Sequence, residues 1–185
     1  MLRLLLPALF ALAIVPNITR AAEEKPYLLN SGDIVKVSVW GDSVEKDELV
    51  PVLPDGNITL KLAGQVKVKG LDIGQAKKAI AEGLKEYYPD PEVSVVVTDA
   101  KGYVVFVQGK VLKPGRVQMT GETEVLQALS EAGGFDKFAD KDEIKVLRRE
   151  GKKQKVLPVN YSDLISGRDL STNFELQAGD TLVVP

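Results

Sequence analysis

Apolar and polar residues alternate in several short segments of the chain. Within YLLNSGDIVKVSVW (27–40), valines alternate with polar residues from Val35 to Val39. A period of two predicts a strand with one buried face, and the valine-rich residues 93–98 predict a further strand. Residues 104–107 are apolar without a break, which predicts a strand covered on both faces.

Apolar residues at helical spacing predict two helices. Asp72 and Gln75 have the spacing of a capping box, which begins the first helix. Thr123 is the expected N-cap of the second helix. The inward positions are Ile73, Ala76, Ile80, Leu84 and Tyr87 in the first helix, and Val125, Leu126, Leu129 and Ala132 in the second. Pro89 and Pro91 stop the first helix, and Gly133 with Gly134 stops the second.

Proline and glycine predict the turns between these elements. The segment Leu53-Pro54-Asp55-Gly56 predicts a hairpin turn, and Lys113-Pro114-Gly115 fits a type II turn. A third turn, around Gly151, joins the predicted strands 144–149 and 155–159. This order predicts an α+β fold of two domains, each with a small sheet and one main helix. They span residues 27–99 and 100–185, and the second is β-grasp-like.

Two distant segments share one pattern. YLLNSGDIVKV (27–37) and FELQAGDTLVV (174–184) align without gaps at their aromatic, leucine, Gly-Asp and valine positions. Glycine accepts a positive φ and aspartate bonds to nearby backbone, so the pattern predicts the same turn leading into a strand at both places. A ligand-binding role for the two Gly-Asp pairs is the alternative.

Residues 1–22 have the form of a cleaved secretory signal. Arg3 precedes an apolar run of 12 residues from Leu4 to Val15, and Thr19-Arg20-Ala21 has small residues at the positions that a signal peptidase requires. The run is shorter than an ordinary transmembrane helix. An uncleaved anchor or a buried core helix is the alternative. The chain contains no cysteine, so we expect neither disulfides nor lipid attachment.

Composition argues against an enzyme and against a nucleic-acid-binding protein. The 24 basic and 26 acidic residues give a net charge of −2, without the basic excess that nucleic acid requires. Neither His nor Cys is present, which excludes nucleophilic triads and most metal sites. The run Asp140–Glu143 lacks the spacing of a calcium loop. A glycosidase with two carboxylates stays formally open, but we expect no catalytic, cofactor or metal site.

Two groups of side chains are candidates for ligand contact. The cations of the hairpin predicted around Gly151 are expected to touch an anionic polymer or an acidic partner. They are Arg148, Arg149, Lys152, Lys153 and Lys155. The alternative is a solvated tip that discourages edge-to-edge strand pairing. Trp40, Tyr87 and Tyr88 could stack on sugar rings, or could pack at the ends of a strand and a helix.

The ordered motifs of residues 27–185 resemble a known family. PDG (54–56), AGQV (63–66) and the segment YYPDPEVSVVV (87–97) are similar to the polysaccharide export domain of outer-membrane capsule and exopolysaccharide exporters (Wza-like proteins). VFVQGKVLKPGRVQM (105–119), with PGR and then ALSEAGG (128–134), resembles the SLBB β-grasp module that follows it in that family. The tail GDTLVVP (179–185) is also typical.

The resemblance implies a periplasmic protein that is associated with the outer membrane. It implies a homo-oligomeric ring through which polysaccharide leaves the cell, without a covalent step or a cofactor. The implied partners are the polysaccharide and an inner-membrane co-polymerase, often a tyrosine kinase. The second hypothesis is a soluble periplasmic module that binds a saccharide or small ligand and transports nothing.

The chain departs from the long members of that family. They carry a lipidated cysteine, several β-grasp modules and a C-terminal amphipathic helix, whereas this sequence has no cysteine, one such module and a final strand. Membrane-spanning backbone must form a helix or a closed barrel. We therefore expect the protein to dock on a separate outer-membrane β-barrel or on the co-polymerase.

Overall fold

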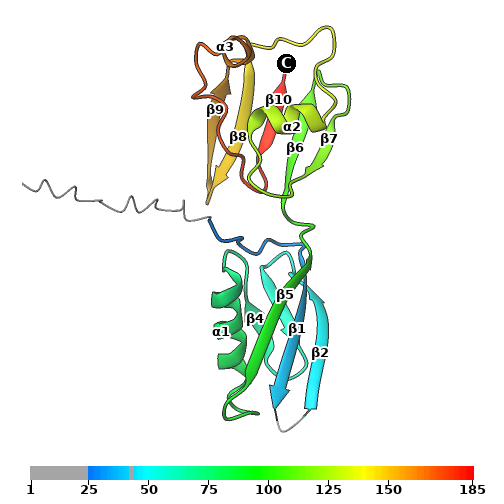
Figure 1. Cartoon of the computed structure of the whole chain (residues 1–185), viewed down its shortest axis with the longest axis vertical. Coiled ribbons are helices and arrows are strands. Elements are labelled where there is room, and N and C mark those ends of the chain that lie inside the picture. The colour runs from blue at the N-terminus through cyan, green and yellow to red at the C-terminus, as the bar shows by residue number, and fades with distance from the viewer. Residues whose placement is uncertain (1–24, 42–43) are drawn as a thin grey trace, which may run out of the picture.

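The computed structural model describes residues 25–41 and 44–185. These residues form two lobes that follow one another along the longest axis of the molecule (Figure 1). The strands up to β5 and those from β6 onward belong to separate sheets. The expected signal sequence at residues 1–22 lies outside the described residues.

The first lobe combines a three-stranded antiparallel sheet, a hairpin and a helix. The sheet has the order β2-β1-β5, built from β1 (Ile34–Gly41), β2 (Val44–Pro51) and β5 (Glu92–Asp99). The hairpin is β3 (Asn57–Leu60) with β4 (Gly64–Lys67). Helix α1 (Ile73–Leu84) buries Ala76, Ile80 and Leu84 against the valines of β1 and β5. The predicted capping box is confirmed: Asp72 and Gln75 bond reciprocally.

The turn at residues 53–56 does not join a hairpin. The Gly56 N–H donates to the Leu53 carbonyl at 2.8 Å, and Gly56 has φ +83°, so the tight turn itself forms. The strands on either side of it, β2 and β3, lie in different sheets. The hairpin prediction is therefore wrong, because the chain leaves the first sheet here and pairs β3 with β4. Tyr87, predicted inward, follows the end of α1 and is exposed.

The second lobe is a five-stranded sheet with two short helices. Its order is β7-β6-β10-β8-β9, in which β10 runs parallel to β6 and all other neighbours are antiparallel. The elements are β6 (Val104–Gly109), β7 (Gly115–Gln118), α2 (Val125–Glu131), β8 (Ile144–Glu150), β9 (Lys153–Val159), α3 (Tyr161–Ser166) and β10 (Thr181–Val184). Helix α2 packs Val125, Ala128 and Leu129 into the core over this sheet.

Helices cover only one face of the second sheet in the described part of the chain. Val105 and Val107 point into the core, whereas Phe106 is 40% exposed on the opposite face. The expectation of a strand buried on both faces is therefore wrong at Phe106. At the end of β6, a Cβ on Gly109 would lie 1.9 Å from the Val184 carbonyl oxygen, so only glycine fits beside β10.

Two local predictions differ from the structure, and one helix was not predicted. Helix α2 is capped by Glu124, whose N–H donates to the Gln127 side chain at 2.8 Å, whereas Thr123 donates to the Gly121 carbonyl. Gly115 has φ +146°, outside the type II value of about +80°. Helix α3 was not predicted; Asn160 caps it and Gly167 ends it. The α+β class is confirmed, but the first lobe has two sheets where one was expected, because β3 and β4 pair apart from β2-β1-β5.

Candidate functional site

The carboxylate of Asp33 ties the connection between the lobes to the first lobe. Asp33 is fully buried and directly precedes β1. Its Oδ2 accepts hydrogen bonds from the Tyr27 hydroxyl at 2.5 Å and from the Asn30 N–H at 2.8 Å. Its Oδ1 accepts a 2.8 Å hydrogen bond from the N–H of Gly102, between β5 and β6. These bonds offset the desolvation of the buried charge and hold the connection in place.

The same contact explains the glycine at position 102. A Cβ added there would lie 2.5 Å from the Ser31 carbonyl oxygen, 2.7 Å from the Asn30 Cβ and 2.9 Å from the Asp33 carboxylate. Two of these neighbours are held in the turn that precedes β1, so they cannot move aside without breaking it. Only glycine allows the connection to approach the first lobe this closely.

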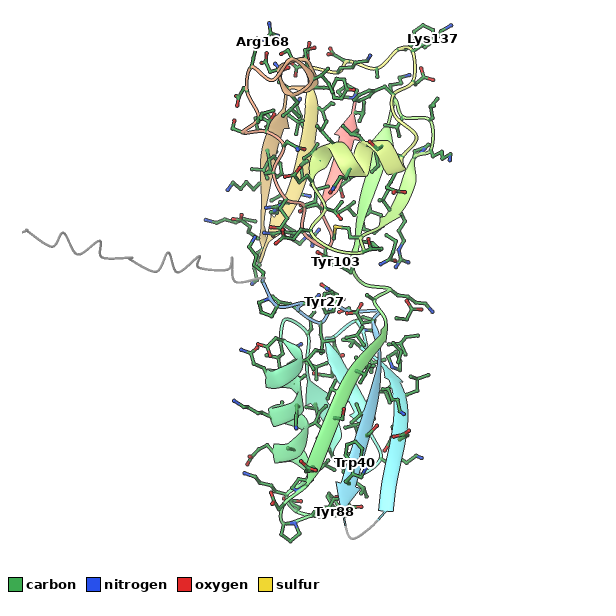
Figure 2. The ribbon with its side chains drawn as sticks, viewed as in Figure 1. Tyr27, Trp40, Tyr88, Tyr103, Lys137 and Arg168 are labelled. Atoms are coloured by element: carbon green, nitrogen blue, oxygen red, sulfur yellow. The ribbon has the colours of Figure 1, made fainter. Side chains whose placement is uncertain are left out.

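Two tyrosines meet where the lobes join (Figure 2). The rings of Tyr27 and Tyr103 form an edge-to-face pair with centroids 5.3 Å apart. Burial and the hydrogen bond to Asp33 raise the pKa of the Tyr27 hydroxyl, and burial also raises the pKa of Tyr103. Both phenols therefore stay neutral at physiological pH. Tyr103 uses its hydroxyl to donate to the Gly121 carbonyl at 3.1 Å.

A cleft of about 900 Å³ opens beside these tyrosines and is lined by residues of both lobes. Its volume lies in the range of small-molecule sites. Its charged lining residues are Asp99, Glu122, Glu175 and Lys25, and Lys25 pairs with Glu175 at 2.5 Å. Phenol rings, amides and a surplus of acids suit a neutral polar ligand such as a sugar and disfavour an anion.

Sequence reasoning missed this cleft. Tyr27 and Glu175 line it together although they are far apart in the chain. The only signal was the repeated pattern, since Tyr27 begins one copy and Glu175 lies in the other. That pattern predicts two turns, but it does not predict that the two turns border one cleft.

Arg148, one of the five predicted basic residues, pairs with the aspartate of the second Gly-Asp turn. Its guanidinium contacts the buried Asp180 carboxylate through Nη2 at 2.6 Å and Nε at 3.1 Å, and donates to the Glu175 carbonyl at 3.0 Å. The Arg148 side chain is only 13% exposed and lies over the ring of Phe174. Arg148 is therefore engaged within the fold, and the exposed cations at this hairpin are Arg149, Lys152, Lys153 and Lys155.

The exposed cations of the hairpin do not form one patch. Strand alternation places Lys153 and Lys155 on the same side as Arg148, which faces the helix layer, and Arg149 on the opposite side. Lys152 lies in the turn itself. This turn is at the end of the second lobe that faces the first (Figure 1). Lys155 lies 3.8 Å from Glu150, and Arg149 has no carboxylate partner among the described residues.

The candidate aromatic residues lie in the first lobe. Trp40 is 41% exposed at the end of β1, on the sheet face opposite α1, and Tyr87 is exposed just after α1. Tyr88 packs against the core of the lobe. Figure 2 shows Trp40 and Tyr88 near the end of this lobe that is far from the second lobe. Trp40 and Tyr87 therefore offer open ring surface, whereas Tyr88 offers less.

The acids do not assemble into a reactive set within residues 25–41 and 44–185. No group of three Asp or Glu side chains there could hold a metal ion. In the run 140–143, Asp140 accepts a hydrogen bond from the Asp142 N–H, and Asp142 accepts one from the N–H of the distant Ser162. In the same part of the chain, none of the helices is long and apolar enough to cross a membrane.

Two family descriptions match consecutive parts of the chain. Residues 21–98 match the family described as polysaccharide biosynthesis/export protein. Residues 104–184 match the SLBB domain. The first match includes strands β1 to β5, and the second match includes strands β6 to β10.

Two proteins with similar sequences have names that also refer to the transport or export of polysaccharide. The polysialic acid transport protein KpsD of Escherichia coli is 30% identical over 159 residues, which cover 85% of this chain and 28% of KpsD. The EPS I polysaccharide export outer membrane protein EpsA of Ralstonia nicotianae (strain ATCC BAA-1114 / GMI1000) is 27% identical over 142 residues, covering 62% of this chain and 36% of EpsA. The chain thus spans well under half the length of these relatives.

Proposed function

Because the chain belongs to the family of outer-membrane polysaccharide export proteins, we propose that it is a component of a capsular or exopolysaccharide export machine. In this role it forms an oligomeric conduit that passes polysaccharide across the outer membrane with partner proteins. The family consists of transport proteins, so the chain acts by binding and guiding a polymer and not by catalysis.

The observation that carries the proposal is the order of the two domains over most of the chain. A polysaccharide export domain is followed at once by an SLBB domain. The relatives named for polysialic acid transport and for polysaccharide export match 85% and 62% of the chain. The Asp33–Gly102 hydrogen bond and the Tyr27–Tyr103 contact hold the two domains together. A subunit whose domains keep one orientation is suited to repeat around a ring.

The proposal also includes the cellular location of the protein and its partners. We place the protein in the periplasm at the outer membrane, after removal of a signal sequence at residues 1–22. Its partners are a polysaccharide, an inner-membrane co-polymerase, which can be a tyrosine kinase, and a separate outer-membrane β-barrel. Formation of pores in lipid bilayers by the purified mature chain alone would contradict the need for that barrel.

Stoichiometry tests the conduit directly. The mature chain, purified without detergent, should assemble into a closed homo-oligomer of one defined size in native mass spectrometry, with rings in negative-stain images. A monomer over the whole accessible concentration range, together with a saturable glycan site, would contradict the conduit.

The cleft beside Tyr27 and Tyr103 supports a second candidate function. A soluble periplasmic module that binds a saccharide or small ligand would use this cleft and would not need to oligomerise. Glu122→Gln, a conservative change in the cleft lining, should then alter the affinity for a neutral oligosaccharide in calorimetry. An unchanged affinity would remove the support that the cleft gives to this function.

A further inference from the structure

The second sheet has a face that no described element covers. Helix α2 lies on the near face of this sheet in Figure 1, and the core side chains of β6, β8 and β10 point toward it. The residues between those core positions point to the opposite face, because side chains alternate along a strand. We call this opposite surface the open face of the second sheet.

A row with apolar residues at three of its four positions crosses the open face from β6 to the edge strand β9. The strand register places Phe106 beside Thr181, Thr181 beside Leu147, and Leu147 beside Val156. Phe106 is 40% exposed and Val156 is 55% exposed, so the row is open to solvent. Four strands spaced by about 4.8 Å give a row about 14 Å long. This geometry is a shallow apolar track and not a pocket.

Cations flank this row, and the face contains no acidic residue at its strand positions. Lys145 and Arg149 lie two residues before and two residues after Leu147, so they stand on either side of the row. Arg116 is the neighbour of Phe106 on the edge strand β7, where it also donates to the Lys101 carbonyl. Lys145 lies 3.7 Å from the exposed Glu143, which directly precedes β8, and Arg149 has no carboxylate partner among the described residues.

Amide side chains complete the same pattern. Gln154 is the cross-strand neighbour of Arg149, and Gln108 lies two residues from Phe106 on the open face. Both are exposed. An apolar row bordered by amides and cations matches a chain of sugar rings, which have apolar faces and a polar rim. Guanidinium and ammonium groups beside that row select carboxylate or phosphate substituents.

We propose that the open face of the second sheet is the contact surface for a polyanionic polysaccharide strand, with Arg149, Lys145 and Phe106 as its principal residues. This inference rests on the proposed function and adds the charge class of the polymer. The ligand lies along the apolar row, and the two cations pair with its acidic groups.

The exposed face of the first sheet has different charges from the open face of the second sheet, and this difference supports the proposed polysaccharide contact. The face of that sheet opposite α1 also exposes apolar side chains, at Trp40, Leu49 and Val96. Its charges differ, because Asp47 pairs with Lys36 at 2.5 Å and Glu92 adds an acid beside Trp40. A polyanion is repelled there and attracted to the open face of the second sheet.

The hairpin itself provides matched variants. Arg149→Glu with Lys145→Glu reverses two charges on the open face, and Lys153→Glu with Lys155→Glu reverses two charges on the opposite side of the same sheet. All four side chains are exposed, so both double variants should fold. The probe is a size-defined fragment of the polysaccharide that the native host releases, used before and after chemical reduction of its carboxyl groups to neutral alcohols.

Binding is measured by calorimetry on the full mature chain at low and at physiological salt. The open-face variant should bind the native fragment at least about tenfold more weakly, as should wild type with the reduced fragment. The Lys153/Lys155 variant should stay within about twofold of wild type, and added salt should weaken wild-type binding. Phe106→Ala should lower affinity without changing its salt dependence, because it removes only the apolar contact.

Three results would overturn the inference. The first is that the host polysaccharide has no acidic groups. The second is that the two charge-reversed variants lose equal affinity for the fragment. The third is that the open-face variant forms a smaller oligomer but binds the fragment as wild type does. The last result would instead assign the face to contact between copies of this chain.

Complementation separates this inference from the proposed function. If deletion of the gene stops export and the open-face variant restores export fully, the proposed function stands and the contact surface is wrong. If deletion leaves export intact, the proposed function fails, whereas fragment binding still decides the contact surface.

Discussion

The turn before β1 and the turn before β10 share one local structure but use it for different contacts. In both, an aspartate Oδ2 accepts a 2.8 Å hydrogen bond from the backbone N–H three residues earlier, at Asn30 for Asp33 and at Gln177 for Asp180. The other hydrogen bonds to the two carboxylates come from different donors. Asp33 is satisfied by a phenol and a backbone amide, whereas Asp180 is satisfied by the guanidinium of Arg148.

The difference shows how a repeated sequence pattern acquires separate structural roles. The aromatic residue six positions before the aspartate is Tyr27 in the first copy, and its hydroxyl reaches the carboxylate. In the second copy this residue is Phe174, which has no hydroxyl, and Arg148 lies over its ring and pairs with the acid. The first turn therefore joins two domains, and the second fixes β8 beside β10.

The largest effect is expected from Asp180→Ala. The change leaves the Arg148 guanidinium, which is only 13% exposed, without its carboxylate, and it should lower the free energy of unfolding by about 3 kcal/mol. Denaturant unfolding followed by circular dichroism measures the loss. The double variant Arg148→Met with Asp180→Asn should lose less, because no unpaired charge remains buried. A loss below about 1 kcal/mol for Asp180→Ala would show that the pair is dispensable.

Gly102→Ala should have the next largest effect, at about 2 kcal/mol. Its Cβ would meet the Ser31 carbonyl at 2.5 Å, so the hydrogen bond to Asp33 must break or the turn must shift. Limited proteolysis should then cut the connection between the lobes faster. Gly121→Ala is the control, because a Cβ there has nothing within 4 Å. Equal behaviour of the two variants would argue against a fixed connection.

Tyr27→Phe should have a smaller effect, about 1 kcal/mol, because it removes one hydrogen bond to Asp33. The pKa of Tyr27 in the folded state is raised above the ordinary 10.0. The hydroxyl therefore contributes stability that is fully present below pH 10 and is lost at higher pH, where the unfolded phenol ionises first. Denaturant unfolding should show a smaller gap between wild type and variant above pH 10 than at neutral pH. A gap independent of pH would contradict this.

Lys25→Ala should have the smallest effect. Lys25 pairs with Glu175 across the junction, but the lysine is fully exposed and its side chain must be ordered to form the pair. We expect no measurable change in the unfolding midpoint. A clear loss would mean that this ion pair, and not Asp33, dominates the junction.

Local chemistry accounts for the parts of the fold that could be predicted from sequence. The capping box of Asp72 and Gln75 and the hairpin around Gly151 depend on residues close in the chain, and both form as predicted. Helix α3 was missed because its six residues carry little periodicity, although Asn160 and Gly167 are ordinary helix-end residues.

Long-range pairing accounts for what was missed in the candidate site. Strand alternation could already have separated Arg149 from Arg148, whereas the face of Lys153 and Lys155 depends on the register of the hairpin. It could not show that Arg148 is engaged, because its partner Asp180 lies 32 residues away. The contact of Asp33 with Gly102, across 69 residues, likewise depends on the folded chain.

A role in polysaccharide export is tested most directly by an in-frame deletion in the native host. The measurement compares cell-surface and released polysaccharide with the polysaccharide retained inside the cell. The account predicts loss of external polymer with retained polymer inside, and recovery when the wild-type gene is returned. Unchanged external polymer, in a strain that also lacks any paralogue, would contradict the export role and favour the soluble binding module.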